Sequence, residues 1–411
     1  MTGTGEGSAA ERPIGVVRGT RDWLPADYAR LASLERQLID GFVQAGYTPM
    51  RTPILEFTEL HERKSGAGIV AKLIELPEHG QAGTCLRPEL TAGIVRVYTE
   101  APECPPLPWR VCMSGPVFRY LPPKRGRDRE FTQVGIEMIG AGGPAADAEV
   151  IALADRSLRT VGIADAKIRV GHVGLIMEML GRSGLPPAAT EALVQMLSEA
   201  ASDGGDVRAL ESAVDQLAGW LQSGREVDEV LPAVGQADDR GVDRLFRHLV
   251  PDVTGRRSGH EIINRLRRKW NLGTSLHEAL DRVRAQVKAL AGLRGPYREM
   301  LKRLAKEYAE IAPESVQALT DLANALEQRG IDLGRIELDL SFGRGIGFYT
   351  QMIFEMTVMT PDGPTDVCGG GRYDGLAKVL GSKRDDRGVG FAFGLERLYQ
   401  ILNDQDGKDR R

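Results

Sequence analysis

Sheet-forming segments lie on both sides of a long helix-rich block, and this order constrains the fold more than any other feature of the sequence. Alternating apolar and polar residues occupy 83–98, 109–120 and 129–140, and sheet signals return after residue 335. Between them, from 186 to 330, the chain is rich in Ala, Leu, Glu and Arg and has few strand signals. This order favours one α+β domain, with an antiparallel sheet and a mainly helical insertion, over two tandem domains.

Local patterns predict the individual elements. Four apolar residues recur every three or four positions and predict a helix that begins near residue 26: Leu31, Leu34, Leu38 and Phe42. The segment 47–57 is typical of a strand with prolines at its edges. We expect a long hairpin or strand pair at 335–358, a glycine-rich turn at 368–376, and a strand that runs into a helix at 388–402.

The predicted domain organisation has four parts. Residues 1–14 are expected to form a flexible leader, 15–175 and 330–402 the core, 176–329 the helical insertion, and 403–411 a charged tail. A chain of 411 residues is too long for one ordinary compact domain, which agrees with a large domain that carries an insertion.

Composition excludes several classes of protein. Apolar residues make up 42% and charged residues 27%, as in globular chains. No apolar run approaches the roughly 18 residues of a membrane span. The N-terminus has no secretory signal, so we expect a cytoplasmic location. The net charge of −4 gives no general attraction to nucleic acid. The four cysteines lack CxxC spacing and the six histidines are scattered, which predicts reduced, buried or half-buried thiols and no metal site.

Arginines and glutamates at sheet positions are the first candidate functional residues. Arg119, Arg344 and Arg397 lie among Gly and aromatic neighbours, where a guanidinium needs a partner or a polar cleft. Each alone fits a structural ion pair, whereas the three together favour an anion-binding cleft. Glu89 and Glu137 could each hold an ammonium or accept an imidazole N–H, and a salt bridge within the sheet remains an open alternative.

Other residues add weaker signals. Thr91, Gln133 and Tyr349 could complete a hydrogen-bond set around a small polar ligand. The run GGGRYDG lacks the spacing of a phosphate-binding loop, and the basic run at 265–270 is typical of a solvated helix face. No nucleophile elbow is visible, so covalent catalysis is not expected.

Several motifs in a fixed order resemble the catalytic core of class II histidyl-tRNA synthetases. They are GTRDWLP (19–25), GYTPMRTPILE (46–56), LRPELTAG (86–93), GPVFRY with GRDREFTQVGIE (115–137), RGIGFYTQMIFE (344–355), GGGRYDGL (369–376) and GFAFGLERL (390–398). The resemblance implies a six-stranded antiparallel sheet flanked by helices, and a homodimer built through the first motif.

The resemblance also implies roles for individual residues around histidine. Glu89, Thr91 and Gln133 would hold its amino group. Glu137 and Tyr349 would contact its imidazole.

Around the carboxylate and the nucleotide, the implied roles fall on four positions. Arg344 would neutralise the histidine carboxylate or an adjoining phosphate. Arg119 and Arg397 would hold ATP phosphates, and Phe131 would stack on adenine.

The chain departs from the family pattern at several positions. Leu121 replaces a glutamate that accepts hydrogen bonds near ATP, and Leu90 replaces a glycine. Gly347 and Phe348 stand where the family has Asp and Tyr. The chain ends nine residues after the expected helix at 402, where synthetases continue into an anticodon-binding domain. The histidine half is thus largely intact, and the ATP half has lost an acceptor.

With these departures the chain resembles the synthetase-like regulatory subunits of ATP phosphoribosyltransferase, and this resemblance implies a histidine-binding subunit that confers feedback control on the first step of histidine biosynthesis. Such a chain needs no catalysis and no cofactor of its own. Its expected partners are L-histidine and the catalytic subunit, in a larger hetero-oligomer that contains a homodimer of this chain, with neither tRNA nor membrane. The alternative is a histidine-activating enzyme, a histidyl-tRNA synthetase or a tRNA-independent ligase, that uses ATP and Mg²⁺. Arg119, Arg344 and Arg397 would then be catalytic.

Overall fold

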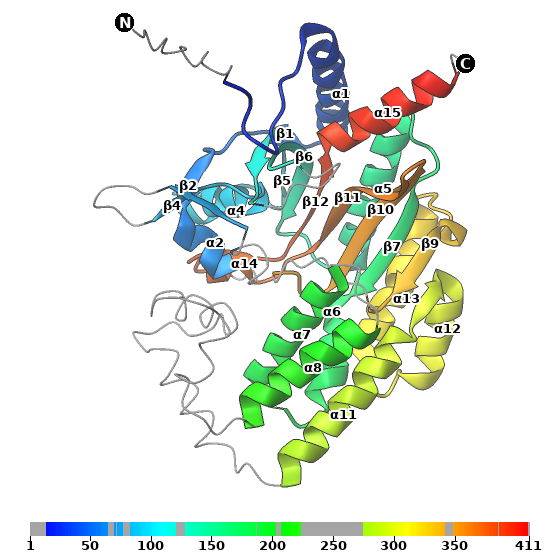
Figure 1. Cartoon of the computed structure of the whole chain (residues 1–411). Coiled ribbons are helices and arrows are strands. Elements are labelled where there is room, and N and C mark those ends of the chain that lie inside the picture. Colours follow the sequence, from blue (N-terminus) through cyan, green and yellow to red (C-terminus); the bar gives the residue numbers. More distant parts are fainter. Residues whose placement is uncertain are drawn as a thin grey trace, which may run out of the picture.

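The fold is built on a large mixed sheet with helices around it (Figure 1). The computed structural model describes residues 14–64, 70, 72–76, 83–120, 128–185, 187–202, 207–222, 274–341, 348–384 and 386–409. Within these ranges the sheet has nine strands, in the order β1-β5-β6-β12-β11-β10-β7-β9-β8. In that order they are Thr48–Pro49, Trp109–Phe118, Glu130–Ile139, Gly388–Gly394, Gly363–Arg372, Met352–Thr360, Lys167–His172, Ile336–Asp339 and Arg294–Pro296.

The six strands from β5 to β7 in this order pair with one another in antiparallel fashion, which confirms the expected antiparallel sheet as the centre of the fold. Strand β1 is parallel to β5, and β9 is parallel to β7, so the complete sheet is mixed. Strand β8 comes from within the expected insertion and pairs with β9, which extends the same sheet.

Strand β12 has large apolar residues on one face and small residues on the other. Its large residues Val389, Phe391 and Phe393 belong to the main hydrophobic core, where Phe42 packs against both phenylalanine rings. The alternate positions Gly388 and Gly390 carry no side chain. Because successive side chains point to opposite faces of a strand, one face of β12 packs in the core and the other leaves room for side chains of neighbouring strands.

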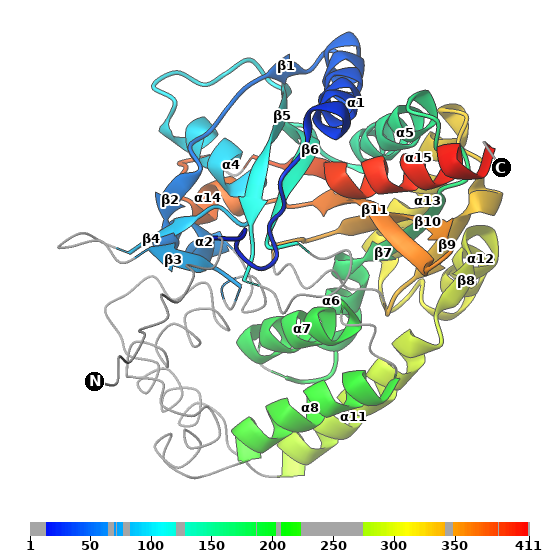
Figure 2. The ribbon, with the colours of Figure 1, turned by 45° about the horizontal axis from the view of Figure 1, so that its top comes forward.

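Helices supply the rest of the core. Helices α1 (Pro25–Gln44), α5 (Pro144–Thr160) and α15 (Leu395–Asp409) pack on the sheet, and α13 (Pro313–Gln328) packs on α5. Helices α6 (Val173–Gly181), α7 (Pro187–Ser202), α8 (Val207–Gln222) and α11 (Thr274–Ala291) extend away from the sheet, and α12 (Tyr297–Glu307) lies beside β8 (Figure 2). A 3-10 turn spans Leu333–Arg335. None of the described helices is both long and apolar enough to span a bilayer.

A small module lies at the β1 end of the large sheet (Figure 1). It contains the strands β2 (Leu55–Phe57), β4 (Thr84–Leu86) and β3 (Ile74–Leu76), in that order, and the helices α2 (Thr58–Lys64), α4 (Thr91–Glu100) and α14 (Leu376–Val379). Both α2 and α14 pack against α4.

Several local predictions were wrong. The segment 83–98 was expected to be a strand, but only Thr84–Leu86 is one and Thr91–Glu100 is helix α4. The buried residues Ile94, Val95 and Tyr98 follow helical spacing, which the alternating interpretation overlooked. The segment 47–57 forms two short strands in different sheets rather than one strand.

The C-terminal sheet was also mispredicted in part. Strands β9 and β10 do not form a hairpin because β7 lies between them. The expected turn at 368–376 is largely strand β11, which is hydrogen-bonded on both sides. Helix α15 continues to Asp409, through most of the expected tail at 403–411. Three of the four reduced cysteines are buried, but Cys104 is exposed.

A buried histidine should make stability depend on pH. His172 caps helix α6 by accepting the Leu175 N–H at 3.0 Å, and burial lowers the pKa of His172 to about 4. Below the unfolded pKa of about 6.5, the unfolded state binds a proton that the folded state excludes. Stability present at pH 7 is therefore lost as pH falls towards 4, by about 3 kcal/mol.

Urea unfolding of the wild type and of His172→Asn at pH 7 and pH 4.5 tests this expectation. Asparagine can also accept the capping N–H but does not titrate, so the variant should lose less stability on acidification. An equal loss in both proteins would contradict the expectation.

Candidate functional site

A cavity of about 280 Å³ opens on the face of the sheet where β11 and β12 carry glycines. It is bounded by β6, β10, β11 and β12, by the start of α4 and by the first turn of α15. All predicted site residues except Arg344 line it: Glu89, Thr91, Arg119, Phe131, Gln133, Glu137, Tyr349 and Arg397. Arg344 lies outside the described residues, as do Leu121 and Gly347.

Glycines make room for the floor of this cavity. Gly390 pairs with Glu137 in the β12–β6 register, and a Cβ at residue 390 would lie 1.9 Å from the Glu137 Oε2 atom. A Cβ at Gly388 would lie 2.1 Å from the ring of Tyr373. A larger residue at either position would therefore displace a side chain of the floor.

Glu137 and Tyr373 form a buried hydrogen-bonded pair on this floor. Glu137 is 5% exposed and Tyr373 is 3% exposed, and the tyrosine hydroxyl donates to the Glu137 carboxylate. Burial, together with the charge of Glu137, raises the pKa of Tyr373 well above its usual value, so the phenol remains a donor. A carboxylate accepts several hydrogen bonds, so Glu137 has capacity for a ligand N–H.

Aromatic rings form the wall beside this pair. Phe348 contacts Tyr349 with ring centroids 4.7 Å apart, and it meets Tyr373 edge-on at 6.1 Å. A flat, partly polar ring fits between such walls because aromatic pairs favour offset and edge-on contacts.

Glu89 lies at another end of the cavity, where helix α4 begins. Its carboxylate accepts the Thr91 N–H at 2.7 Å and the Ala92 N–H at 3.0 Å, and the His61 Nδ1 atom lies 3.7 Å away. These contacts fix the direction of a 5% exposed carboxylate and place negative charge at a helix N-terminus. Such a carboxylate is suited to an ammonium group.

In the predicted nucleotide half of the cavity, two arginines donate to backbone carbonyls. Arg119 donates from Nε to the Pro88 carbonyl at 2.9 Å, and its guanidinium lies 5.2 Å from the centre of the Phe131 ring. Phe131 therefore contacts a cation of this chain. Arg397 donates to the Asp366 carbonyl at 2.8 Å.

Sequence reasoning missed several lining residues. Tyr373 lies in the GGGRYDG run, which lacks phosphate-loop spacing and belongs to the family motifs, but no role was predicted for Tyr373 itself. Glu396 accepts the Thr132 N–H at 2.9 Å, and burial raises the pKa of Glu396. Arg21 pairs with Asp128 at 2.5 Å on the cavity wall. Each of these three residues lies in one of the family motifs, and that position is the signal that could have found them.

The sheet topology and the flanking helices form a class II aminoacyl-tRNA synthetase-like fold. Within this class, the chain belongs to the histidyl-tRNA synthetase-like family, because the family model "Histidyl-tRNA synthetase" matches residues 19–285 and 229–398.

Relatives carry two different names. The chain is 32% identical to an "ATP phosphoribosyltransferase regulatory subunit" of Moorella thermoacetica over 393 residues, which covers 95% of this chain and 82% of the relative. It is 30% identical to a "Histidine--tRNA ligase" of Pyrococcus horikoshii over 387 residues, which covers 94% of this chain and 74% of the relative.

Solved structures agree on the fold. A Bacillus halodurans protein described as an "ATP phosphoribosyltransferase regulatory subunit/histidyl-tRNA synthetase" is similar with a TM-score of 0.66 and 22% identity, and the match covers 95% of this chain and 84% of that one. A histidine–tRNA ligase subunit of Alicyclobacillus acidocaldarius gives a TM-score of 0.63 and 22% identity, and the match covers 97% of this chain and all of that one.

Removing the Tyr373 hydroxyl should destabilise the fold. Tyr373→Phe leaves the buried Glu137 carboxylate without its phenol donor, at a cost of about 1–3 kcal/mol in unfolding free energy. Tyr399→Phe is a matched control because the Tyr399 hydroxyl donates to an exposed partner, Asp27. Chemical denaturation of both variants should show a much larger loss for Tyr373→Phe. Equal losses of unfolding free energy would contradict the expectation that the buried hydrogen bond contributes more than the exposed one.

Proposed function

We propose that this chain is a histidine-binding regulatory subunit of ATP phosphoribosyltransferase. The observation that carries the proposal is the pairing of Glu137 with Tyr373 on the cavity floor, with Glu89 elsewhere on the wall of the same cavity. An imidazole N–H fits the first carboxylate and an α-ammonium fits the second. The relative from Moorella thermoacetica bears the corresponding name.

In this proposal, the remaining predicted residues complete the histidine site. Thr91 and Gln133 assist Glu89 at the amino group, and Tyr349 contacts the imidazole beside Glu137. Arg344 neutralises the carboxylate of histidine. The lining positions of Thr91, Gln133 and Tyr349 support these assignments.

Histidine binding would then control a catalytic partner. Histidine biases a conformational equilibrium of this subunit, and a coupling of about 1–3 kcal/mol between the two proteins is enough for useful feedback. The chain works in the cytoplasm as a homodimer within a larger hetero-oligomer. Exposed apolar side chains on the small module, including Leu55 and Phe57, support self-association.

A second function has specific support. Arg119, Phe131 and Arg397 line the same cavity, and histidine–tRNA ligases are as close in sequence as the regulatory subunit. These observations favour a histidine-activating enzyme that uses ATP. Against it stands Leu121, which occupies the position of an acceptor near ATP in the family.

Reconstitution tests the regulatory proposal. A short catalytic subunit of ATP phosphoribosyltransferase is assayed alone, with this chain, and with this chain plus histidine. We expect the complex to be inhibited by histidine and the catalytic subunit alone to be unaffected. Inhibition that is the same with and without this chain would contradict the proposal.

Glu137→Ala should abolish this control by weakening histidine binding. The imidazole N–H loses a charged acceptor, which costs about 1.5–3 kcal/mol, or roughly tenfold or more in affinity. Calorimetric titration with histidine measures the loss. Unchanged affinity would refute the role of Glu137. Leu121→Glu is the control, and it should leave histidine affinity unchanged because we assign that position to the nucleotide half.

A further inference from the structure

Arg87 is one of the largest fully buried side chains among the described residues, at 2% exposed. Its acceptors are mainly backbone carbonyls rather than carboxylates. Nε donates to the Pro116 carbonyl at 2.8 Å, and Nη1 donates to the carbonyls of Thr52 at 2.9 Å and Pro53 at 3.2 Å. Burial lowers the pKa of Arg87, so keeping a charged guanidinium here is costly and calls for a compensating role.

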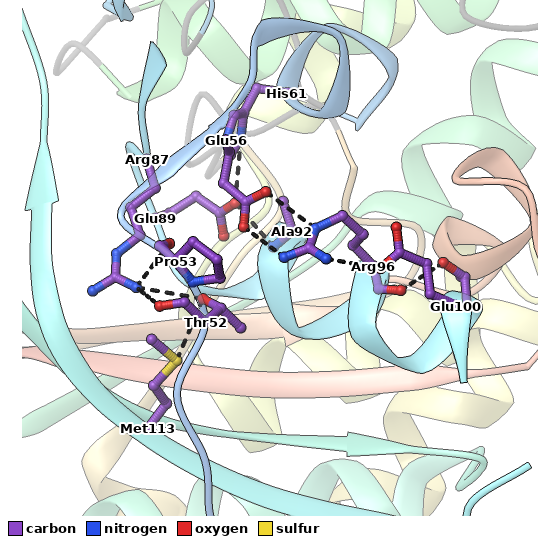
Figure 3. A network of polar contacts seen from close by, with 11 residues as sticks. Thr52, Pro53, Glu56, His61, Arg87, Glu89, Ala92, Arg96, Glu100 and Met113 are labelled. Atoms are coloured by element: carbon purple, nitrogen blue, oxygen red, sulfur yellow. Dashed lines mark hydrogen bonds and ion pairs between the residues drawn. The ribbon is translucent and has the colours of Figure 1, made fainter. Parts of the chain in front are cut away.

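The backbone of Arg87 is held at the same place. Its N–H donates to the Ile54 carbonyl at 2.9 Å, and its carbonyl accepts the Phe118 N–H at 2.9 Å. Side chain and backbone together therefore join three segments: the chain before β2, strand β5, and the stretch after β4. Glu89 is two residues further along that stretch (Figure 3).

The space for the guanidinium depends on a glycine of β5. A Cβ at Gly115 would lie 2.2 Å from the Nη2 atom of Arg87. Nη2 is buried and has no hydrogen-bond partner within the described structure, so this nitrogen costs free energy instead of stabilising the site. The hydrogen bonds of Arg87 are therefore made by Nε and Nη1, while Nη2 occupies the space that Gly115 leaves.

The charge of Arg87 is attracted to the nearby carboxylates of Glu56 and Glu89, but it cannot attract the ammonium group of a ligand. A guanidinium near Glu89 would repel the ammonium of an amino acid that binds there, so its charge would weaken binding rather than strengthen it. The contribution of Arg87 to ligand recognition is therefore indirect, through the position of Glu89. The carbonyl contacts hold residues 87–89 while the amides of α4 orient the Glu89 carboxylate.

We propose that Arg87 is a positioning residue for recognition of the ligand amino group, which acts by holding the backbone that carries Glu89. This inference rests on the proposed histidine-binding function. It predicts that a change at Arg87 weakens binding only of ligands that have an amino group. A general structural role of Arg87 would instead affect all ligands of the cavity.

The test uses the purified full-length chain and two ligands. L-histidine and 3-(imidazol-4-yl)propionate, which lacks the amino group, are titrated calorimetrically into the wild type, Arg87→Lys and Gly115→Ala. Lysine keeps the charge but loses the fork, and the alanine methyl at residue 115 displaces the guanidinium. Both variants should bind histidine at least about tenfold more weakly and bind the propionate within about twofold of the wild type.

Arg96→Lys is the matched control. Arg96 lies in the same network, but its donors go to Glu56 at 2.9 and 3.1 Å and to Glu100 at 2.9 Å, and not to residues 52–53 or β5 (Figure 3). This variant should keep the wild-type ratio of the two affinities.

The outcomes separate this inference from the proposed function. A wild type that does not bind histidine overturns the proposed function and this inference with it. A wild type that prefers histidine over the propionate, together with variants that lose both ligands equally or neither, overturns the role of Arg87 alone. If Arg87→Lys does not fold, the milder Gly115→Ala carries the comparison, because retained propionate binding shows that its cavity is intact.

Discussion

A buried carboxylate is the constraint on which the site depends. Glu137 is buried on strand β6, where an ionised group is costly unless it is hydrogen-bonded. The Tyr373 hydroxyl supplies one bond, and Gly390 leaves the space that the carboxylate occupies. The glycines of β12 therefore leave space for the candidate site, while its phenylalanines pack in the hydrophobic core on the other face. The alternation of large and small residues along β12 gives the strand these two different faces.

The elements that could be predicted were those with strong periodicity or a continuous motif. The helix with Leu31, Leu34 and Leu38 and the strand-to-helix segment at 388–402 were predicted correctly. The strand β11 was not, because its glycines are typical of turns and only pairing on both sides makes them a strand. Helix α4 was missed because its buried residues Ile94, Val95 and Tyr98 were interpreted as strand alternation, although Glu89 accepts the first two N–H groups of the helix.

The candidate site was predicted by resemblance rather than by spacing. Residues such as Glu89 and Arg397 are more than 300 positions apart, and nothing local in the sequence brings them to one cavity. The order of the motifs predicted their proximity, because proteins with the same fold place these motifs around the same cavity. What the resemblance could not give is the setting of each group: the Tyr373 bond to Glu137, the ring of Phe131 beneath Arg119, and the buried fork of Arg87.

The central claim is that this cavity holds histidine without activating it. Histidine-dependent exchange of pyrophosphate into ATP measures activation directly, on the same chain and under conditions where calorimetry detects histidine binding. We expect no exchange above background. Exchange at an enzyme-like rate would contradict the account and assign the chain to the histidine-activating enzymes.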